Sequence, residues 1–163
     1  MPEKKTALWD LVCETDPNYT TTVNQRGGFT AIGAQYQIKC ATEQFGSFGI
    51  GWGVQEEKFT FEMDTRLVVY QAELFYTSNG VEGSVPIHSS CTTSWGTKLD
   101  DDCIKKVATD ALTKGLSKLG FNADVFMGQF DDNKYVSTLE TKYGSKNKAQ
   151  SKPQSNKSAD LDI

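Results

Sequence analysis

The longest regular pattern of apolar positions runs from Asp100 to Phe121 and has the period of an α-helix. At about 100° per residue, eight small or apolar residues fall on one face: Ile104, Val107, Ala108, Ala111, Leu112, Gly115, Leu116 and Leu119. Three aspartates open the pattern, where carboxylates can cap free amides and face the positive end of the helix dipole. Gly120 follows it, as a left-handed residue that ends a helix would. We predict one amphipathic helix that buries this face and exposes a mildly basic, hydroxyl-rich face.

From Trp52 to about Ser90 the apolar positions instead recur with period two. The segments 58–63 and 66–77 alternate, and Asn79-Gly80 is a strong signal for a tight hairpin turn. Pro86 lies in the returning segment and indicates an edge strand or a bulge. The pattern predicts a three-stranded antiparallel meander. One face can accept the long helix, and the other face or an open edge can accept a partner.

The segments before the sheet predict two further helices. Residues 8–12 form a short apolar helix that ends before Asp16-Pro17, and we expect Trp9 to dock it onto the body or a neighbouring subunit. Residues 18–28 are typical of a loop. A second helix is predicted from Thr30, as N-cap, to Phe45. The glycine-rich segment 46–53 follows a helix and lacks the pattern of a phosphate-binding loop, so we interpret it as a turn that leaves Trp52 and Phe48 in the core or a subunit interface.

These patterns predict an α+β fold with an α-β-β-β-α core and three regions. They are an N-terminal arm (1–28), a core domain (29–142) with an apolar segment at 121–135 that packs back, and a disordered polar tail (143–163). The tail ends in alternating acidic and apolar residues, which we interpret as a solvated end rather than a docking peptide. No run of 18 apolar residues and no signal peptide is present, so we expect a cytoplasmic protein that does not span a membrane.

The charged residues do not form a basic surface overall. The formal net charge is −4, and residues 143–163, with four lysines and two aspartates, leave −6 on the body. Any site for a polyanion on the body must therefore be a local groove. The four cysteines lack a CxxC pair and His88 is the only histidine, so we expect no zinc site, no cofactor and no nucleophilic catalysis.

Three stretches in collinear order resemble the phage branch of the Rad-fifty-two superfamily, whose members are ATP-independent single-strand annealing proteins. They are Tyr36 to Gly46, YQIKCATEQFG; Gly51-Trp52-Gly53 at the start of a strand; and Ala108 to Leu112, ATDAL, continuing to Leu119-Gly120. Leu8-Trp9 and Thr15-Asp16-Pro17 are also similar to phage members. The resemblance covers about residues 7–135.

The resemblance implies a non-enzymatic protein that forms a homo-oligomeric ring and holds single-stranded DNA by its backbone for annealing and recombination. It gives the site as a set of lysines and one tyrosine: Lys114, Lys106, Lys118, Lys105, Lys39 and Tyr36. The family's pair of basic residues on the long helix falls on Thr113 and Lys114, and a further arginine falls on Ser117. Tyr36 lies near the place of an arginine in eukaryotic members. Candidate partners are a phage exonuclease or a host single-strand binding protein, in the cytoplasm of a bacterial host.

Two other functions stay open at this stage. One is a non-enzymatic assembly or host-interaction protein that uses the open sheet and the tail. The other, which we favour less, is a metal-dependent nuclease that uses Asp100, Asp101 and Asp102 with a further carboxylate. Consecutive acids at a helix start point in different directions, so capping is the better interpretation of these three.

Overall fold

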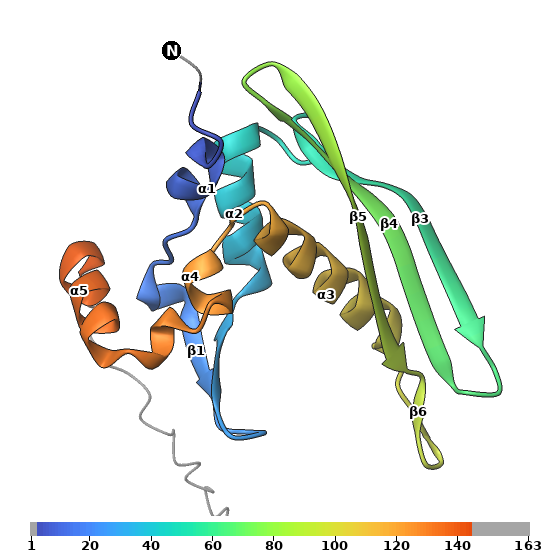
Figure 1. Ribbon diagram of the computed structural model, residues 1–163. Helices are drawn as coiled ribbons and strands as arrows, with labels where there is room; N and C mark the ends of the chain where they lie inside the picture. Colours follow the sequence, from blue (N-terminus) through green and yellow to red (C-terminus); the bar gives the residue numbers. More distant parts are fainter. Residues whose placement is uncertain (1–2, 145–163) are drawn as a thin grey trace, which may run out of the picture.

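The computed structural model describes residues 3–144 and confirms a mixed α+β fold around a three-stranded antiparallel sheet (Figure 1). The helices and 3₁₀ turns are α1 (Ala7–Val12), η1 (Pro17–Tyr19), α2 (Ala34–Phe45), α3 (Cys103–Lys118), α4 (Ala123–Phe126), η2 (Gln129–Asp131) and α5 (Asn133–Tyr143). The strands are β1 (Thr20–Val23), β2 (Phe29–Ile32), β3 (Trp52–Glu62), β4 (Leu67–Ser78), β5 (Val81–Thr92), β6 (Ser94–Trp95) and β7 (Lys98–Leu99). The predicted disordered tail (143–163) begins too early, because α5 continues to Tyr143, and residues 145–163 lie outside the described residues.

The predicted meander is present, with β4 between β3 and β5. Ser78 pairs with Val81 across the turn, and both Asn79 and Gly80 have positive φ (51° and 75°). A two-residue turn with both residues in this region matches the twist of the strands it joins. Pro86 lies on β5, an edge strand of the sheet, as predicted.

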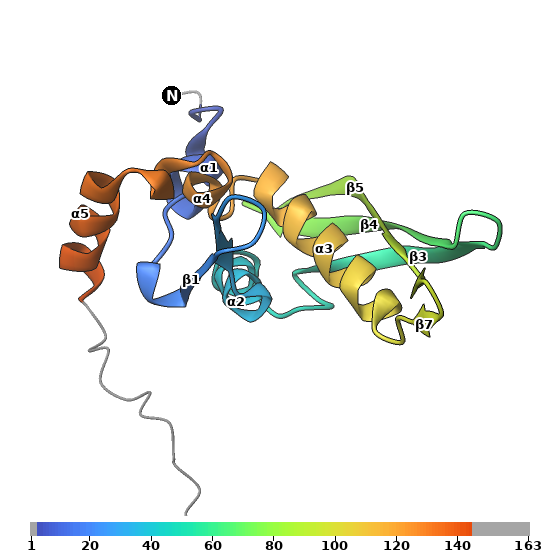
Figure 2. The ribbon, with the colours of Figure 1, turned by 90° about the horizontal axis from the view of Figure 1, so that it is seen from below.

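The helices cover one face of this sheet, and α3 lies along β4 and β5 (Figures 1 and 2). The core lies between the sheet and the helices. It is formed by every second side chain of the strands, those that face the helices, and by one side of α2 and one side of α3. Its fully buried members include Ala41, Trp52, Val68, Tyr70, Leu74, Val107, Ala111, Leu116 and Phe121. Trp52 is thus a core residue, whereas Phe48 is half exposed and packs edge-on against its ring.

The long helix follows the predicted face and C-terminus, but its capping aspartate lies ahead of the N-cap position. Gly120 has φ 103° and donates its N–H to the Ser117 carbonyl, while Phe121 N–H reaches Leu116 O. These two bonds satisfy carbonyls at the helix end. Asp102 occupies the N-cap position without a side-chain cap bond, and the Asp100 carboxylate accepts a hydrogen bond from the Asp102 N–H at 3.1 Å, so the predicted capping is seen at Asp100, just ahead of the helix. Ile104 is also exposed rather than buried, because the first turn of α3 directs Cys103 and Val107 toward the core instead.

The N-terminal third differs most from its prediction. Residues 18–28 are not a loop, because β1 pairs with β2 in an antiparallel hairpin from Thr20↔Ile32 to Val23↔Phe29. The hairpin spans the predicted boundary at residue 28. Because β2 includes Thr30, α2 begins later than predicted, at Ala34 after Gly33. Trp9 does contact the body: a side chain on Gly120 would meet its ring at 2.9 Å.

The segment after α3 returns to the N-terminal arm through a buried polar cluster. Phe121 is buried as predicted, but Phe126 and Met127 are exposed. Asp124, with 3% exposure, accepts hydrogen bonds from Thr15 N at 2.8 Å and Tyr135 Oη at 2.8 Å. Thr15 Oγ1 donates to the same carboxylate. The helix α5, which the sequence patterns did not predict, is joined to α4 by the Tyr135–Asp124 bond, lies beside η1 and buries Leu139.

Candidate nucleic-acid interface

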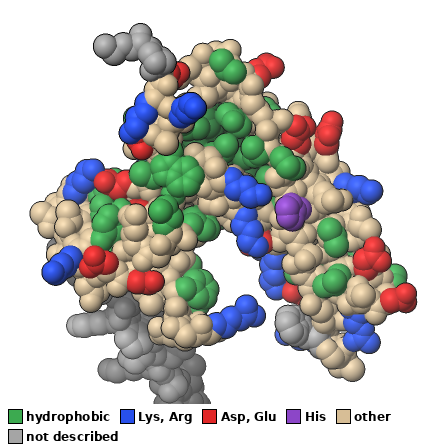
Figure 3. Space-filling model, in the orientation of Figure 1, with side chains coloured by type: hydrophobic (Ala, Val, Ile, Leu, Met, Phe, Trp, Pro, Cys, Tyr) green, Lys and Arg blue, Asp and Glu red, His purple; other side chains and the backbone are tan. Residues whose placement is uncertain are grey.

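A shallow hollow lies where α3 runs along the outer edge of β5, and we call it the α3–β5 seam. Its volume is about 250 Å³, and it is lined by Ile87, His88, Ala111, Lys114, Gly115, Ser117 and Lys118. Figure 3 shows Lys and Arg side chains following one another down this boundary between the helices and the sheet, beside the histidine. The seam therefore has an apolar floor and basic walls, an arrangement that suits an anion carried on an organic chain.

Lys114 is exposed and forms an ion pair with Asp110, one helical turn earlier, at 2.7 Å. Asp110 also accepts a hydrogen bond from Ser89 Oγ of β5, so this carboxylate ties the helix to the strand. Lys118 has no carboxylate partner among residues 3–144. The C-terminal half of α3 thus presents two lysines against one engaged carboxylate.

The two lysines near the start of α3 are engaged by the aspartates that precede the helix. Lys106 contacts Asp100 at 2.6 Å and Lys105 contacts Asp102 at 3.7 Å. The hydrogen bond from Lys106 holds the pKa of Asp100 below its ordinary value and raises the pKa of Lys106 itself. Both side chains of the Lys105–Asp102 pair are exposed, and such pairs contribute little net free energy, so Lys105 can exchange its carboxylate for a phosphate at small cost. The Asp100 side chain is only 12% exposed, so release of Lys106 would leave a largely buried carboxylate without its charged partner.

Tyr36 and Lys39 lie together on α2 but line a different hollow, of about 370 Å³, with Tyr19, Glu14 and Asp16 among its other residues. The Tyr36 ring stacks on Tyr19 with centroids 4.3 Å apart and an interplanar angle of 2°. Burial raises the pKa of Tyr36. Lys39 pairs with Glu43 at 3.5 Å and lies 6.0 Å above the Tyr19 ring. The structure thus divides the predicted site residues into three sets: two lysines of the seam, two lysines at the start of α3, and Tyr36 with Lys39 on α2.

Two residues of the seam were not predicted as site residues: His88 and Ser117. The resemblance places Ser117 where the family has an arginine, and strand alternation alone gives His88 no neighbour on α3. Ser117 lies on α3 between Lys114 and Lys118, whereas His88 borders the hollow from β5, with its side chain on the sheet face opposite Ile87 and Ser89. Only this tertiary contact, and no local pattern, could have identified His88.

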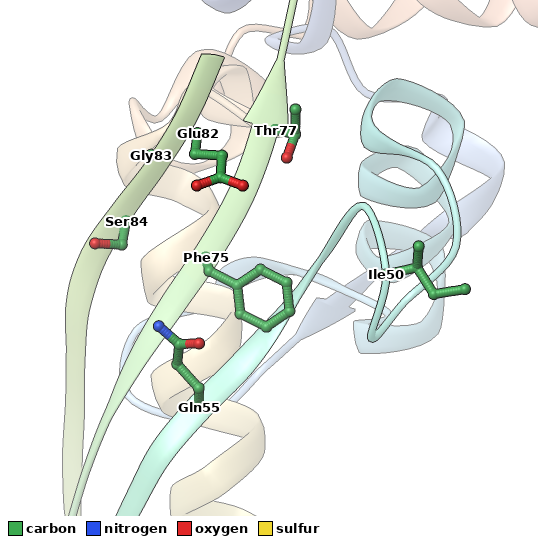
Figure 4. Close-up of a pocket in the computed structure, with 7 residues that line it drawn as sticks. All are labelled: Ile50, Gln55, Phe75, Thr77, Glu82, Gly83 and Ser84. Atoms are coloured by element: carbon green, nitrogen blue, oxygen red, sulfur yellow. The ribbon is translucent and has the colours of Figure 1, made fainter. Parts of the chain in front are cut away.

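Two further hollows lie at opposite ends of the sheet. The first, of about 390 Å³, is formed by Phe75 of the central strand, Ile50 of the loop before β3, and polar residues of β3 to β5 (Figure 4). We call Ile50 and Phe75 the loop patch. The second, of about 510 Å³, includes Phe61, Met63 and Leu99, which we call the hairpin patch. Ile50, Met63 and Leu99 are 83%, 84% and 77% exposed.

Residues 3–144 contain no group of three or more His, Cys, Asp or Glu side chains placed to hold a metal ion. Asp100 and Asp102 instead engage Lys106 and Lys105. Among the same residues, every helix is too short or too polar to cross a membrane. No family model matches the sequence, and no curated protein matches it.

Proposed function

We propose that this protein binds single-stranded DNA along the α3–β5 seam and, as a homo-oligomer, anneals complementary strands without ATP. The observation that carries the proposal is the pair of exposed lysines, Lys114 and Lys118, on one open seam of an otherwise acidic body. Annealing requires a surface that neutralises phosphates and leaves the bases free to pair. The resemblance of three collinear stretches to annealing proteins supports the same function.

The contacts of α3 are compatible with exchange of protein carboxylates for phosphates. Lys114 reaches Asp110 only through an exposed pair within the same helix, and Asp110 keeps its hydrogen bond from Ser89 when the lysine leaves. Lys118 needs no such exchange. The bound strand therefore gains two phosphate contacts for the loss of one weak ion pair.

A net charge of −4 does not oppose this site, because the interaction is local. At physiological ionic strength charges more than about 8 Å apart are largely screened. An oligomer repeats the seam once per subunit, so a few lysines in each chain produce a continuous path along a strand. We place this activity in the cytoplasm of a bacterial host, with a phage exonuclease or a host single-strand binding protein as partner.

A second candidate function is that of a non-enzymatic assembly or host-interaction protein. The exposure of the loop patch and the hairpin patch favours it, because apolar clusters of this kind mark protein contacts. Self-association is common to both functions, so affinity for single strands separates them.

The test follows annealing of two complementary oligonucleotides without ATP, for the native protein and for the double variant Lys114→Gln/Lys118→Gln. A plot of the log of the DNA-binding constant against the log of the salt concentration has a negative slope. We expect the loss of two phosphate contacts to make this slope shallower by about 1.4, at about 0.7 per phosphate, and to slow annealing. The matched control is Lys58→Gln/Lys134→Gln, which removes the same charge from exposed positions on β3 and α5. If both double variants slow annealing equally, the seam is not the DNA-binding site. Absence of binding at low salt would overturn the proposal and favour an assembly protein.

A further inference from the structure

The hollow that contains Tyr36 lies apart from the seam, and the proposed function does not use it. We call it the tyrosine hollow. It has a volume of about 370 Å³ and is lined from α2, from the chain between α1 and β1, and from the end of α5. Tyrosine rings attract a cation through their faces and carboxylates attract it by charge, so a wall of both suits an ammonium group. Six residues of the lining are of these two kinds: Tyr19, Tyr36, Tyr143, Glu14, Asp16 and Glu43.

Two lysines of the chain show how an ammonium group lies at the rim of this hollow. Lys39 Nζ is 6.0 Å from the centre of the Tyr19 ring and 3.5 Å from a Glu43 oxygen. Lys142 Nζ is 5.6 Å from the centre of the ring of the next residue and 2.7 Å from Glu14. Each lysine therefore combines one tyrosine ring with one carboxylate.

Asp16 is the carboxylate of the hollow that has no cation. Its Oδ1 accepts hydrogen bonds from the N–H and the side-chain amide of Asn18, at 2.9 and 2.8 Å. Among residues 3–144 no lysine or arginine pairs with it. The Tyr36 hydroxyl lies beside it and accepts a hydrogen bond from the Asp16 N–H at 3.2 Å. A third ammonium group would thus find both a ring and a carboxylate here.

We propose that the tyrosine hollow binds lysine side chains of the segment 145–157 of the same chain, and that Asp16 receives the ammonium group. This segment has four lysines and no acidic residue. It also begins at the hollow: Tyr143 is part of the lining, and the Gly144 carbonyl accepts a hydrogen bond from Asn18 Nδ2 at 2.9 Å.

The first two lysines of the segment are within reach of Asp16. Lys146 and Lys148 follow Gly144 by two and four residues, which span at most about 7 and 14 Å of extended chain. A tether this short gives an effective concentration of the order of millimolar, so contacts that are weak between separate molecules suffice. One lysine at a time in the hollow is enough.

Charge favours this occupant over a nucleic acid. The lining has three carboxylates against one lysine, Lys39, and such a wall repels phosphate. The inference therefore gives Tyr36 and Lys39 a role other than the DNA contact that the resemblance implies. It does not depend on DNA binding along the seam.

The first experiment measures trypsin cleavage of the full chain after Lys146 and Lys148, without DNA, by mass spectrometry. Cleavage samples the fraction of molecules in which the lysine is undocked. We expect the native protein to be cleaved about fivefold more slowly than Asp16→Asn/Glu43→Gln, because a ring contact and an ion pair are both weakened. Asparagine can still accept the hydrogen bonds from Asn18, so the local turn is retained. The matched control Glu62→Gln/Asp64→Asn, at exposed positions next to the β3–β4 turn, should be cleaved like the native protein.

A second experiment identifies the partner of the lysines by carbodiimide cross-linking of the native protein. The reagent joins an amine to a carboxylate in contact with it as an amide and takes up the released water as a urea. We expect a link from Lys146 or Lys148 to Asp16 whose yield does not change with protein concentration. A yield that rises with concentration would overturn the assignment to the same chain and make a second copy the occupant.

The outcomes separate this inference from the proposed function. Equal cleavage of the native protein and Asp16→Asn/Glu43→Gln, or the absence of a link to Asp16, overturns the lysine site and leaves the seam untouched. Protein that protects these lysines and forms the link, yet binds no single strand, overturns the proposed function alone.

Discussion

At the scale of single residues, Gly115 sets the distance between α3 and the sheet. A glycine in a helix costs about 1 kcal/mol relative to alanine, so its place in the last turn of α3 needs a compensating contact. That contact is with β5 and β4: an added Cβ would lie 2.4 Å from Ile87 Cγ2 and 3.6 Å from Leu74 Cδ2. The missing side chain therefore allows a close approach on which both the core and the seam depend.

We predict that Gly115→Ala lowers the free energy of unfolding by about 1–3 kcal/mol, because overpacking outweighs the gain in helix propensity. Ile87→Ala alone should cost about 2–5 kcal/mol by leaving a cavity. The double variant should lose at least about 1 kcal/mol less than the sum of the two, since the second change removes the clash. Urea unfolding of the three variants measures this. Strict additivity would show that the two residues do not compete for the same space.

The candidate site was predictable only in part, and the residues show why. The 3.6-residue period places Lys114 and Lys118 on the exposed side of α3. Asp110 and Lys114 are four residues apart on this helix, a spacing that predicts their ion pair. The contact between Lys106 and Asp100 depends on how the chain turns into the helix, at six residues' separation. The place of His88 depends on contact between segments more than twenty residues apart, which no local pattern encodes.

At the scale of elements, the meander was predictable and the N-terminal hairpin was not. Asn79-Gly80 and clean alternation specify β4 and β5 locally. The strand β1 is a run of threonines, without alternation of apolar and polar residues. Its partner β2, Phe29–Ile32, places a threonine just before a segment with helical periodicity, a pattern that predicts Thr30 as an N-cap. Pairing with a strand six residues earlier overrides that preference.

The C-terminal end of α5 is attached through Glu14, whose carboxylate accepts hydrogen bonds from Lys142 Nζ at 2.7 Å and from Tyr143 Oη. Burial alone would raise the pKa of Glu14, but these two hydrogen bonds together hold it below the ordinary value. A carboxyl with a lowered pKa in the folded state contributes stability above its unfolded pKa and loses it as pH falls.

We therefore predict that the docking of α5 is constant from pH 7 to about pH 5 and weakens below about pH 4.3, the ordinary pKa of a glutamic acid. Hydrogen exchange of α5 amides, corrected for intrinsic rates, measures the docking. Glu14→Gln should loosen α5 already at pH 7 and remove most of the pH dependence. Asp131→Asn, a change at an exposed carboxylate in η2, is the control. A pH profile unchanged by Glu14→Gln would assign the attachment to Asp124 and Leu139 instead.

At the scale of the whole molecule, the loop patch and the hairpin patch mark two unlike surfaces at opposite ends of the sheet. Along β4 the residues from Leu67 to Phe75 span about 26 Å, at about 3.3 Å per residue. The sheet edges are less suited to contact between copies. A bulge between Gln55 and Lys58 interrupts β3, and Pro86 removes a donor from β5, and both features oppose edge-to-edge pairing.

Contact between two unlike patches is heterologous, and it produces rings or filaments rather than closed dimers. The proposed homo-oligomer therefore predicts a specific result for variants at each end. Ile50→Glu and Met63→Glu should each abolish higher oligomers, because each places a charge in one patch. An equimolar mixture should form pairs, because one variant keeps an intact hairpin patch and the other keeps an intact loop patch.

Sedimentation velocity of the native protein, of each variant and of their mixture measures this, with Lys58→Glu as a control that puts the same side chain on the open face of the sheet. A monomeric native protein would contradict the proposed oligomer. A mixture that behaves as the sum of its parts would show that the two patches do not meet.

The same mixture also tests the functional role of the oligomer. A pair formed by the two variants has only two seams. The mixture should therefore bind a short strand as tightly as the native protein does, but accelerate the annealing of long strands less than the native protein. Binding and annealing that fall together would mean that assembly forms the seam itself.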